Sequence, residues 1–251
     1  MKKLLAITAL SAALFFGQTA AAEEKAAEEV KPSHVEMVLV LDESGSMSNL
    51  TNDTIGGFNS MIEKEKKLDV DAHVTTVLFN DQYKMLYNRR ELKDVRKMTD
   101  KDYTPGGMTA LLDAVGRTIH KMDMVSGIHR KDKGNKVLFV IITDGEENDS
   151  KEYTYADVKK LIKDRQENAG WEFIFLGANI DAAAAAENLG IDRDRAVKYK
   201  NTGSGVRANF KAVAELSDSL AKSGRVSDEW KETVEKDEDD AAAVSYTHLR
   251  A

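Results

Sequence analysis

Asp42, Ser44 and Ser46 form an alternating group of oxygen-bearing side chains in the segment Asp-Glu-Ser-Gly-Ser. Alternate side chains of a locally extended chain point to the same side, so these three groups can converge on one point. A carboxylate and two hydroxyls that converge in this way are ligands that a hard divalent cation prefers. The segment therefore predicts one part of a metal site.

Two more oxygen groups lie in separate segments. Asp144 follows an apolar run in the segment Thr-Asp-Gly, and Thr109 ends the turn-rich loop of residues 103–109. Two carboxylates and three hydroxyls, without nitrogen or sulfur, suit Mg²⁺, or Mn²⁺ and Ca²⁺, better than zinc or copper. The predicted metal ligands are Asp42, Ser44, Ser46, Thr109 and Asp144.

Each group taken alone has a simpler interpretation. Asp and Ser both cap helices, so the first segment could begin a helix, and Thr109 could be the N-cap of a helix that starts at residue 110. Asp144 alone is typical of a turn before glycine. A calcium-binding EF-hand loop over residues 42–53 is excluded, because its sixth position is Met47 rather than glycine and its twelfth is Asp53 rather than glutamate.

Two periodicities alternate along the chain and predict the elements that must position these residues. Short apolar runs rich in β-branched or aromatic residues indicate strands buried on both faces, and an apolar spacing of three and four residues indicates amphipathic helices. The predicted strands are 37–41, 74–79, 83–87 (antiparallel, after the turn at 80–82), 137–142 and 173–176. The predicted helices are 55–62, 111–122, 158–162, 182–189 with Asp181 as N-cap, and 206–222.

This succession predicts an α/β fold of the doubly wound, Rossmann-like kind. It has a mostly parallel central sheet, one antiparallel edge strand and helices on both faces. Ligands of such sheets bind beyond the carboxyl ends of the strands, where the winding direction reverses. Because Asp42 and Asp144 both follow predicted strands, we expect them at that edge.

The motif Asp42-x-Ser44-x-Ser46, the Thr109 loop and Asp144 together resemble the metal-ion-dependent adhesion site (MIDAS) of von Willebrand factor type A (VWA) domains, the fold shared with integrin inserted domains. The three elements occur in the family's order, and each falls at a predicted strand end or loop. The resemblance covers residues 35–222.

This resemblance implies a role for each ligand. Ser44, Ser46 and Thr109 would contact the metal directly or nearly so, whereas Asp42 and Asp144 would act largely through bound water. One coordination position would stay open for an acidic side chain of a protein partner. The implied function is metal-dependent protein binding of the adhesion or scaffold type, and not catalysis.

Four residues beside the predicted ligands are expected at the rim of the site, where a partner could touch them. They are Glu43, Met47, Gly107 and Glu146.

Two other functions stay open at the level of sequence. A Mg²⁺-dependent phosphohydrolase could use Asp42 as nucleophile, since that residue ends an apolar strand. Haloacid-dehalogenase-like phosphatases need a second aspartate two residues on as general acid, however, and Ser44 occupies that position. Alternatively, the metal could serve only to hold three loops of a scaffold together.

The composition excludes several classes of function. The 251 residues include 36 Lys and Arg against 43 Asp and Glu, a formal net charge of −7, which argues against binding nucleic acid or an anionic membrane. The chain has no cysteine, which excludes disulfides, thiol nucleophiles and Cys-ligated metals. The five histidines are dispersed without a His-Glu-x-x-His pattern, which favours solvent or core positions over zinc binding.

The ends of the chain are expected to lie outside the folded domain. Residues 1–22 combine a basic start, an apolar run and small residues, which predicts a signal peptide and export to the periplasm or beyond the cell. The apolar run is shorter than the ~20 residues that span a bilayer, so no membrane insertion of the mature chain is expected.

The composition of residues 23–34 predicts a charged Ala/Glu/Lys linker, and that of residues 223–243 predicts a polar, acidic tail. Within this tail, Trp230 is expected to pack back on the domain. Residues 244–251 resemble translated sequencing-adapter read-through.

Overall fold

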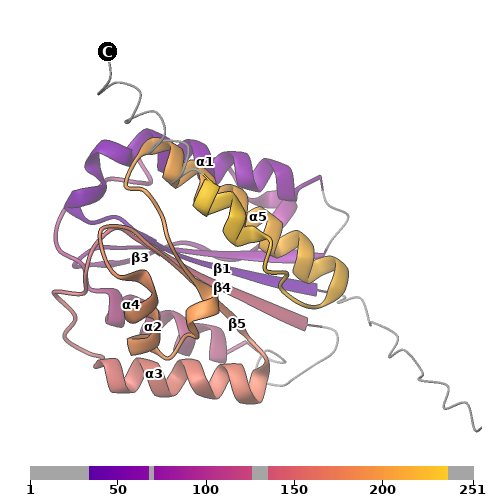
Figure 1. Ribbon diagram of the computed structural model, residues 1–251. Coiled ribbons are helices and arrows are strands. Elements are labelled where there is room, and N and C mark those ends of the chain that lie inside the picture. The colour runs from indigo at the N-terminus through magenta and orange to yellow at the C-terminus, as the bar shows by residue number, and fades with distance from the viewer. Residues whose placement is uncertain (1–33, 68–70, 126–134, 237–251) are drawn as a thin grey trace, which may run out of the picture.

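The computed structural model describes residues 34–67, 71–125 and 135–236 (Figure 1). Its strands are β1 (His34–Asp42), β2 (Ala72–Phe79), β3 (Tyr83–Glu91), β4 (Asn135–Thr143), β5 (Glu172–Gly177) and β6 (Ala196–Lys198). They form one sheet in the order β3-β2-β1-β4-β5-β6, in which β3 runs antiparallel to β2 and the other neighbours are parallel. The predicted doubly wound fold with one antiparallel edge strand is confirmed.

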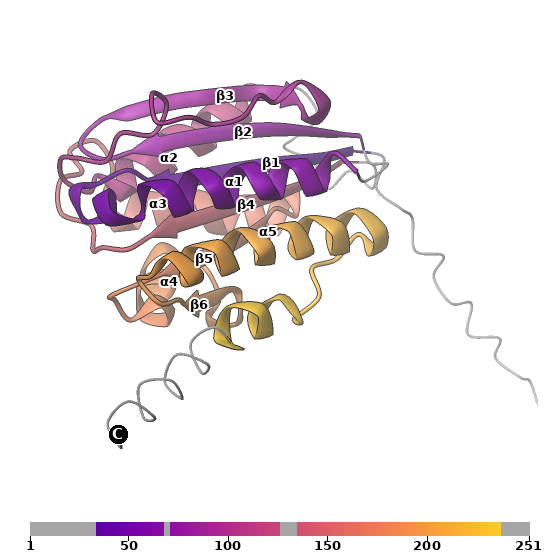
Figure 2. The ribbon, with the colours of Figure 1, turned by 90° about the horizontal axis from the view of Figure 1, so that it is seen from above.

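Helices cover both faces of the sheet, as Figures 1 and 2 show. The elements are α1 (Thr51–Glu65), α2 (Leu111–Asp123), α3 (Tyr155–Asp164), α4 (Ala182–Leu189) and α5 (Gly203–Ser223), with short 3-10 turns at Gly45–Leu50, Leu92–Asp94 and Arg193–Arg195 and a π turn at Arg165–Ala169. α1 and α5 pack against each other on one face, and α2, α3 and α4 lie on the other.

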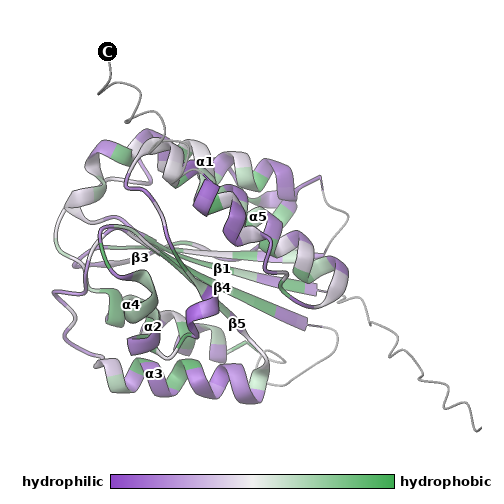
Figure 3. Cartoon of the chain, viewed as in Figure 1, coloured by the Kyte–Doolittle hydropathy of each residue, from purple (hydrophilic) through white to green (hydrophobic). Residues whose placement is uncertain are grey.

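Alternate residues of β1 contribute to two separate parts of the core. Val38 and Val40 pack on the side of α2, α3 and α4, whereas Leu39 and Leu41 pack on the side of α1 and α5. All four side chains are buried. Because both faces of the strand are covered, its sequence is a continuous apolar run and not an alternating one. Figure 3 shows these apolar strands between the two helical layers.

Side-chain caps set the beginnings of three helices, α3, α4 and α5, and at α3 Thr154 and Asp157 form a capping box. Asp181 accepts a hydrogen bond from the N–H of Ala184 at 3.0 Å at the start of α4, as predicted, and Gly190 ends this helix with a φ of 89°. Thr202 accepts from the N–H of Gly205 at 3.2 Å at the start of α5. The glycine-rich segment before residue 206 is therefore the first turn of α5.

Two features lie outside the predicted elements. β6 was not predicted, because three residues are too few to establish a periodicity. Trp230 is 1% exposed and lies in the same core cluster as Val226 and Val234, so it packs back on the domain as expected. The first part of the predicted tail is thus part of the folded domain.

The predicted signal peptide, most of the linker and the last residues of the tail lie outside the described residues. Among the helices that the structure describes, none is both long enough and apolar enough to cross a membrane.

Candidate metal centre

The carboxyl ends of β1 and β4 lie side by side where the winding of the sheet reverses. The two strands are adjacent and parallel, with Leu41 paired to Ile142. β2 lies on one side of this pair and β5 on the other. Doubly wound sheets bind ligands at this position. Asp42 and Asp144 therefore reach the same edge of the sheet, where the order of the strands predicts them.

Asp42 is fixed by hydrogen bonds to both of its carboxylate oxygens. Its Oδ1 accepts from the N–H of Ser44 at 2.7 Å, and its Oδ2 accepts from the Thr143 hydroxyl at 2.6 Å. The Tyr103 hydroxyl also donates to the main-chain carbonyl of Asp42 at 2.6 Å. Asp42 is only 1% exposed. The carboxylate thus lies beneath the loop that contains the two serines.

Ser44, Ser46 and Asp144 form a continuous chain of hydrogen bonds. The hydroxyl oxygens of Ser44 and Ser46 lie 3.0 Å apart, and Ser46 Oγ donates to Asp144 Oδ1 at 2.5 Å. Ser44 and Asp144 are buried, whereas Ser46 is exposed. Hydroxyls can rotate their hydrogens away and present lone pairs to a cation. Three oxygens therefore converge at a point that is accessible from the side of Ser46.

The loop that leads into α2 is joined to the serine loop through its backbone. The N–H of Gly45 donates to the carbonyl of Gly107 at 3.2 Å, and the N–H of Gly106 donates to the carbonyl of Glu43 at 2.9 Å. Gly107 has a φ of 76°, a left-handed conformation that other residues adopt with strain. A Cβ at this position would collide with the Asp81 side chain, so glycine also lets the loop lie close to the turn between β2 and β3.

Thr109 lies in the second loop with its hydroxyl beside the Asp144 segment. Its Oγ1 is 3.8 Å from the position that a Cβ on Gly145 would occupy. Its N–H donates to Asn148 Oδ1 at 2.9 Å, and its carbonyl accepts from the N–H of Asn148 at 3.0 Å. Neither Thr109 nor Ser44 uses its side chain to cap a helix, so the simple capping interpretation fails for both.

Three residues that the sequence analysis missed complete the site. Thr143 binds Asp42, and Asn201 Nδ2 donates to Asp144 Oδ2 at 3.2 Å. The hydroxyl of Tyr199 and Oδ1 of Asn201 are buried without a hydrogen-bond partner in the part of the chain that the structure describes. Buried polar atoms in native proteins usually bind something, including water or an ion. The vicinity of Asp144 thus offers unused polar atoms.

The two carboxylates of the site repel each other. Burial raises the pKa of the Asp42 carboxyl above its ordinary value, the hydrogen bonds from Thr143 and Ser44 lower it, and the charge of Asp144 raises it again. Burial also raises the pKa of the Tyr199 hydroxyl well above its ordinary value, and the charges of Asp144 and Asp42 add to this rise. A cation between the carboxylates would relieve their repulsion, so the charges and the hard oxygen donors both fit a divalent metal.

The four expected rim residues differ in their exposure. Gly107 and Glu146 are exposed. Glu43 is 3% exposed, accepts from Lys84 Nζ at 2.8 Å and also from the N–H of Thr104, and Met47 is 2% exposed in the core. Glu43 and Met47 therefore stabilise the loops from inside and present no surface to a partner.

The geometry also disfavours Asp42 as the nucleophile of a phosphohydrolase. An aspartate nucleophile needs one free carboxylate oxygen with an open approach to the substrate. Both oxygens of Asp42 accept hydrogen bonds, and the residue is buried.

A protein-family model described as "vWA found in TerF C terminus" matches residues 34–191, a range that includes most of the sheet and all five proposed metal ligands. The chain belongs to this VWA family. VWA domains mediate protein interactions, often through a metal. A comparison with curated protein sequences finds no match.

Solved structures share the fold of this VWA domain. Proximal thread matrix protein 1 from the mussel byssus matches with a TM-score of 0.55 and 13% identity over 73% of this chain and 46% of its own. A D319A mutant of the PilB minor pilin from Streptococcus sanguinis matches with a TM-score of 0.54 and 11% identity over 75% and 62%. A form of the mussel protein with a zinc-occupied MIDAS motif matches with a TM-score of 0.50 and 14% identity over 74% and 46%. The chain thus spans less than half the length of the mussel protein.

Proposed function

We propose that this VWA domain binds a divalent cation, Mg²⁺ first, and uses it to capture an acidic group of a protein partner. The observation that supports this proposal most directly is the convergence of Ser44, Ser46 and Asp144 oxygens at the junction of β1 and β4. Thr109 and Asp42 complete the proposed ligand set. Mn²⁺ and Ca²⁺ are alternative ions with the same preference for oxygen.

The chemistry of the ligands supports a carboxylate as the bound group. Hydroxyls are neutral, so a cation held by Ser44, Ser46 and Thr109 keeps much of its charge, and a carboxylate from a partner gains strongly by approaching it. The exposed position of Ser46 leaves such an approach open. The mussel protein with zinc in its MIDAS motif supports metal binding by this fold, although it does not determine the ion that this chain prefers.

Apolar side chains around the site support a protein as the partner. Of the three large hydrophobic residues that are exposed in the described part of the chain, Met108 adjoins Thr109 in the sequence and Tyr155 lines a cleft beside Gly145 and Glu146. The volume of this cleft is about 280 Å³. Exposed apolar groups around a charged centre are typical of interaction surfaces.

The proposal is tested by calorimetric titration of Mg²⁺ and Mn²⁺ into the metal-stripped chain. We expect about one equivalent to bind, and binding to be lost in the double variant Ser44→Ala/Ser46→Ala. Ser60→Ala, which changes an exposed serine of α1, is the matched control and should bind as the original chain does. Equal binding in the double variant would refute the proposed ligand set.

Selection from a random peptide library tests the second half of the proposal. With Mg²⁺ present, the domain should enrich peptides that contain Asp or Glu, and the enrichment should disappear in EDTA. If the enrichment does not depend on the metal, the cation does not bind the acidic group and serves only to hold the loops together.

We also propose that the chain is exported, on the basis of residues 1–22 alone. A fusion of residues 1–35 to a reporter that is active only outside the cytoplasm should give signal, and a silent reporter would contradict export. A metal-dependent partner would then be sought outside the cytoplasm.

A further inference from the structure

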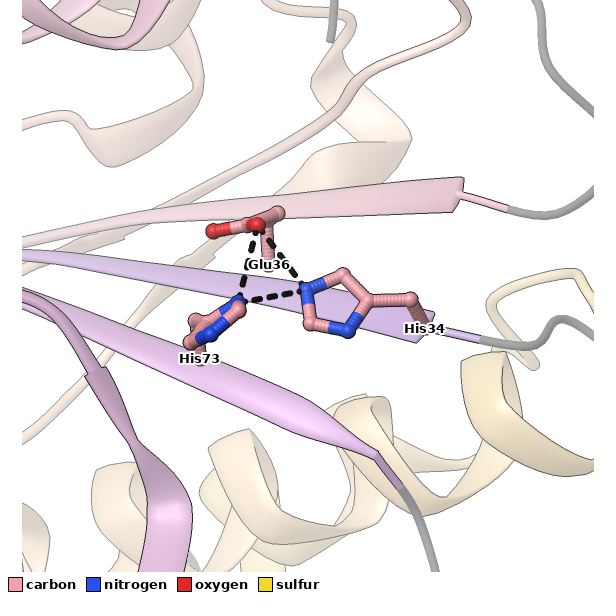
Figure 4. A group of neighbouring side chains, drawn as sticks. All are labelled: His34, Glu36 and His73. Carbon is pink, nitrogen blue, oxygen red and sulfur yellow. Dashed lines mark hydrogen bonds and ion pairs between the residues drawn. The ribbon is translucent and has the colours of Figure 1, made fainter. Parts of the chain in front are cut away.

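Two histidines and a glutamate meet at the opposite end of β1 from the candidate metal centre. His34 and Glu36 lie two residues apart on β1 and point to the same side, and His73 is the register partner of Glu36 on β2. Figure 4 shows the three side chains pointing towards one another. At the usual rise of β-strands, the eight residue-to-residue steps from His34 to Asp42 place the two ends roughly 26 Å apart. This cluster is therefore separate from the site of Asp42.

The three ligand atoms have the spacing of a metal's coordination shell. His34 Nε2 lies 2.9 Å from Glu36 Oε1 and 2.9 Å from His73 Nδ1, and His73 Nδ1 lies 3.3 Å from Glu36 Oε1. Zinc bonds of about 2.0–2.1 Å in a tetrahedron separate neighbouring ligand atoms by roughly 3.3 Å. Small side-chain adjustments would thus bring all three atoms onto one ion.

Asp71 supplies the orienting contact that metal-bound histidines usually have. Its Oδ2 lies 3.1 Å from His34 Nδ1, so it can accept a hydrogen bond from the N–H of that nitrogen while Nε2 faces the cluster. Histidine ligands in proteins commonly donate their second ring N–H to a carboxylate in this way, which fixes the ring and raises its basicity. The contact supports ligation by His34 independently of the spacing.

We propose that His34, His73 and Glu36 form a second metal site, which binds Zn²⁺ and leaves its fourth position to water. Two imidazoles and one carboxylate are a ligand set that zinc accepts with one position open. The set differs from the oxygen ligands near Asp42 and favours a different ion. Because Glu36 is 2% exposed, its carboxylate is a preformed anchor for such an ion.

Arg89 is the group that competes with the metal for this position. Its Nε donates to Glu36 Oε1 and Oε2 at 3.0 and 3.1 Å, and its Nη2 approaches Glu36 and also lies 3.2 Å from His73 Nδ1. Zinc binding requires Nη2 to leave both His73 Nδ1 and Glu36 Oε1, while Nε can keep its bond to Oε2. The Arg89 side chain is 30% exposed, so this movement has space.

Zinc titration of the metal-stripped full chain in saturating Mg²⁺ tests the proposal. We expect one equivalent of Zn²⁺ to bind, with affinity at least about 100-fold lower in His73→Gln and about 10-fold lower in Asp71→Asn. The Ser44→Ala/Ser46→Ala variant should keep its zinc affinity. Co²⁺ in place of Zn²⁺ should give the intense visible absorption of a tetrahedral site, and this absorption should vanish in His73→Gln.

The matched control is His120→Gln, which changes an exposed histidine of α2 that contacts Tyr153 and none of the three proposed ligands, and should leave zinc binding unchanged. The Asp71 side chain is 74% exposed, so Asp71→Asn keeps the test valid if His73→Gln unfolds. The proposal would be overturned if the original chain does not bind zinc, or if Asp71→Asn binds zinc as tightly as the original chain. The cluster would then be an ion-pair network without a metal.

Discussion

Ser46 and Asp144 are separated by 98 positions in the sequence, yet the Ser46 hydroxyl donates to Asp144 Oδ1 at 2.5 Å. The contact exists because β1 and β4 are neighbours in the sheet, so that the loops after both strands meet. Ser44 extends the contact through its own hydroxyl. This arrangement makes oxygen groups from two segments that are distant in the sequence available to one ion.

Thr143 should be important for stability as well as for the site. Thr143→Val removes the donor to Asp42 Oδ2 and leaves a buried carboxylate oxygen unsatisfied, which should lower the free energy of unfolding by about 1–3 kcal/mol. Chemical denaturation of the metal-stripped chain measures the change.

Thr76→Val is the matched control for this substitution. Thr76 is also a fully buried strand threonine, but its hydroxyl has no hydrogen-bond partner in the described residues. Replacing it should leave stability unchanged or raise it by about 1 kcal/mol. If the free energy of unfolding falls equally in both variants, the hydrogen bond to Asp42 does not contribute specifically to stability.

Asn201 should position Asp144 for the metal. Asn201→Ala removes the donor to Asp144 Oδ2 and should weaken Mg²⁺ binding by about 10- to 100-fold, as is usual for groups that orient a ligand. Asn49→Ala, which changes an exposed residue of the serine loop, should leave the affinity unchanged. If calorimetry gives the same Mg²⁺ affinity for both variants, Asn201 has no part in the site.

Two adjacent glycines of α1 should respond in opposite ways to alanine. A Cβ on Gly57 would lie 2.5 Å from the Phe210 ring of α5, so Gly57→Ala should cost about 1–3 kcal/mol of stability. A Cβ on Gly56 would meet nothing within 4 Å, so Gly56→Ala should stabilise the helix by about 0.5–1 kcal/mol. Thermal unfolding of both variants checks the close packing of α1 on α5. A stable Gly57→Ala variant would contradict that packing.

Glu65 should make the stability of the domain depend on pH. Burial raises its pKa from 4.5 to about 7, even though the Ser217 hydroxyl donates to it at 2.5 Å. The folded state therefore binds the proton more tightly than the unfolded state. The stabilisation by this group is complete below about pH 4.5 and is lost as the pH rises through about 7, with a total change of up to roughly 3 kcal/mol.

Glu65→Gln keeps an acceptor for Ser217 and removes the titration. The free energy of unfolding of the original chain, relative to this variant, should fall between pH 4.5 and 7 in denaturant titrations. A difference that is constant over this range would show that Glu65 keeps its ordinary pKa when folded.

The sequence predicted the fold through its strands, because burial on both faces produces apolar runs such as residues 137–142 that are hard to mistake. It predicted Asp42 and Asp144 at one edge because both follow such runs. Thr143 was missed even though its signal was present, a polar residue that ends a buried strand next to Asp144. Asn201 had no comparable signal, since the short strand β6 before it shows no periodicity.

The histidine cluster shows a different limit of sequence analysis. His34 and His73 are 39 positions apart, and only the parallel register of β1 and β2 brings them together. A search for short motifs therefore treats them as dispersed. The burial of Glu43 and Met47 could not be judged either, because Glu43 binds Thr104 of the distant loop from β3 to α2 and Met47 packs into a core cluster drawn from many elements.

We propose above that Ser44, Ser46 and Thr109 hold one cation at the junction of β1 and β4. The most direct measurement is an anomalous difference map from crystals grown with Mn²⁺. We expect one peak within bonding distance of the Ser44 and Ser46 hydroxyls and next to Thr109. An anomalous map with no Mn²⁺ peak at this position, whether or not the ion is bound elsewhere, would contradict this site.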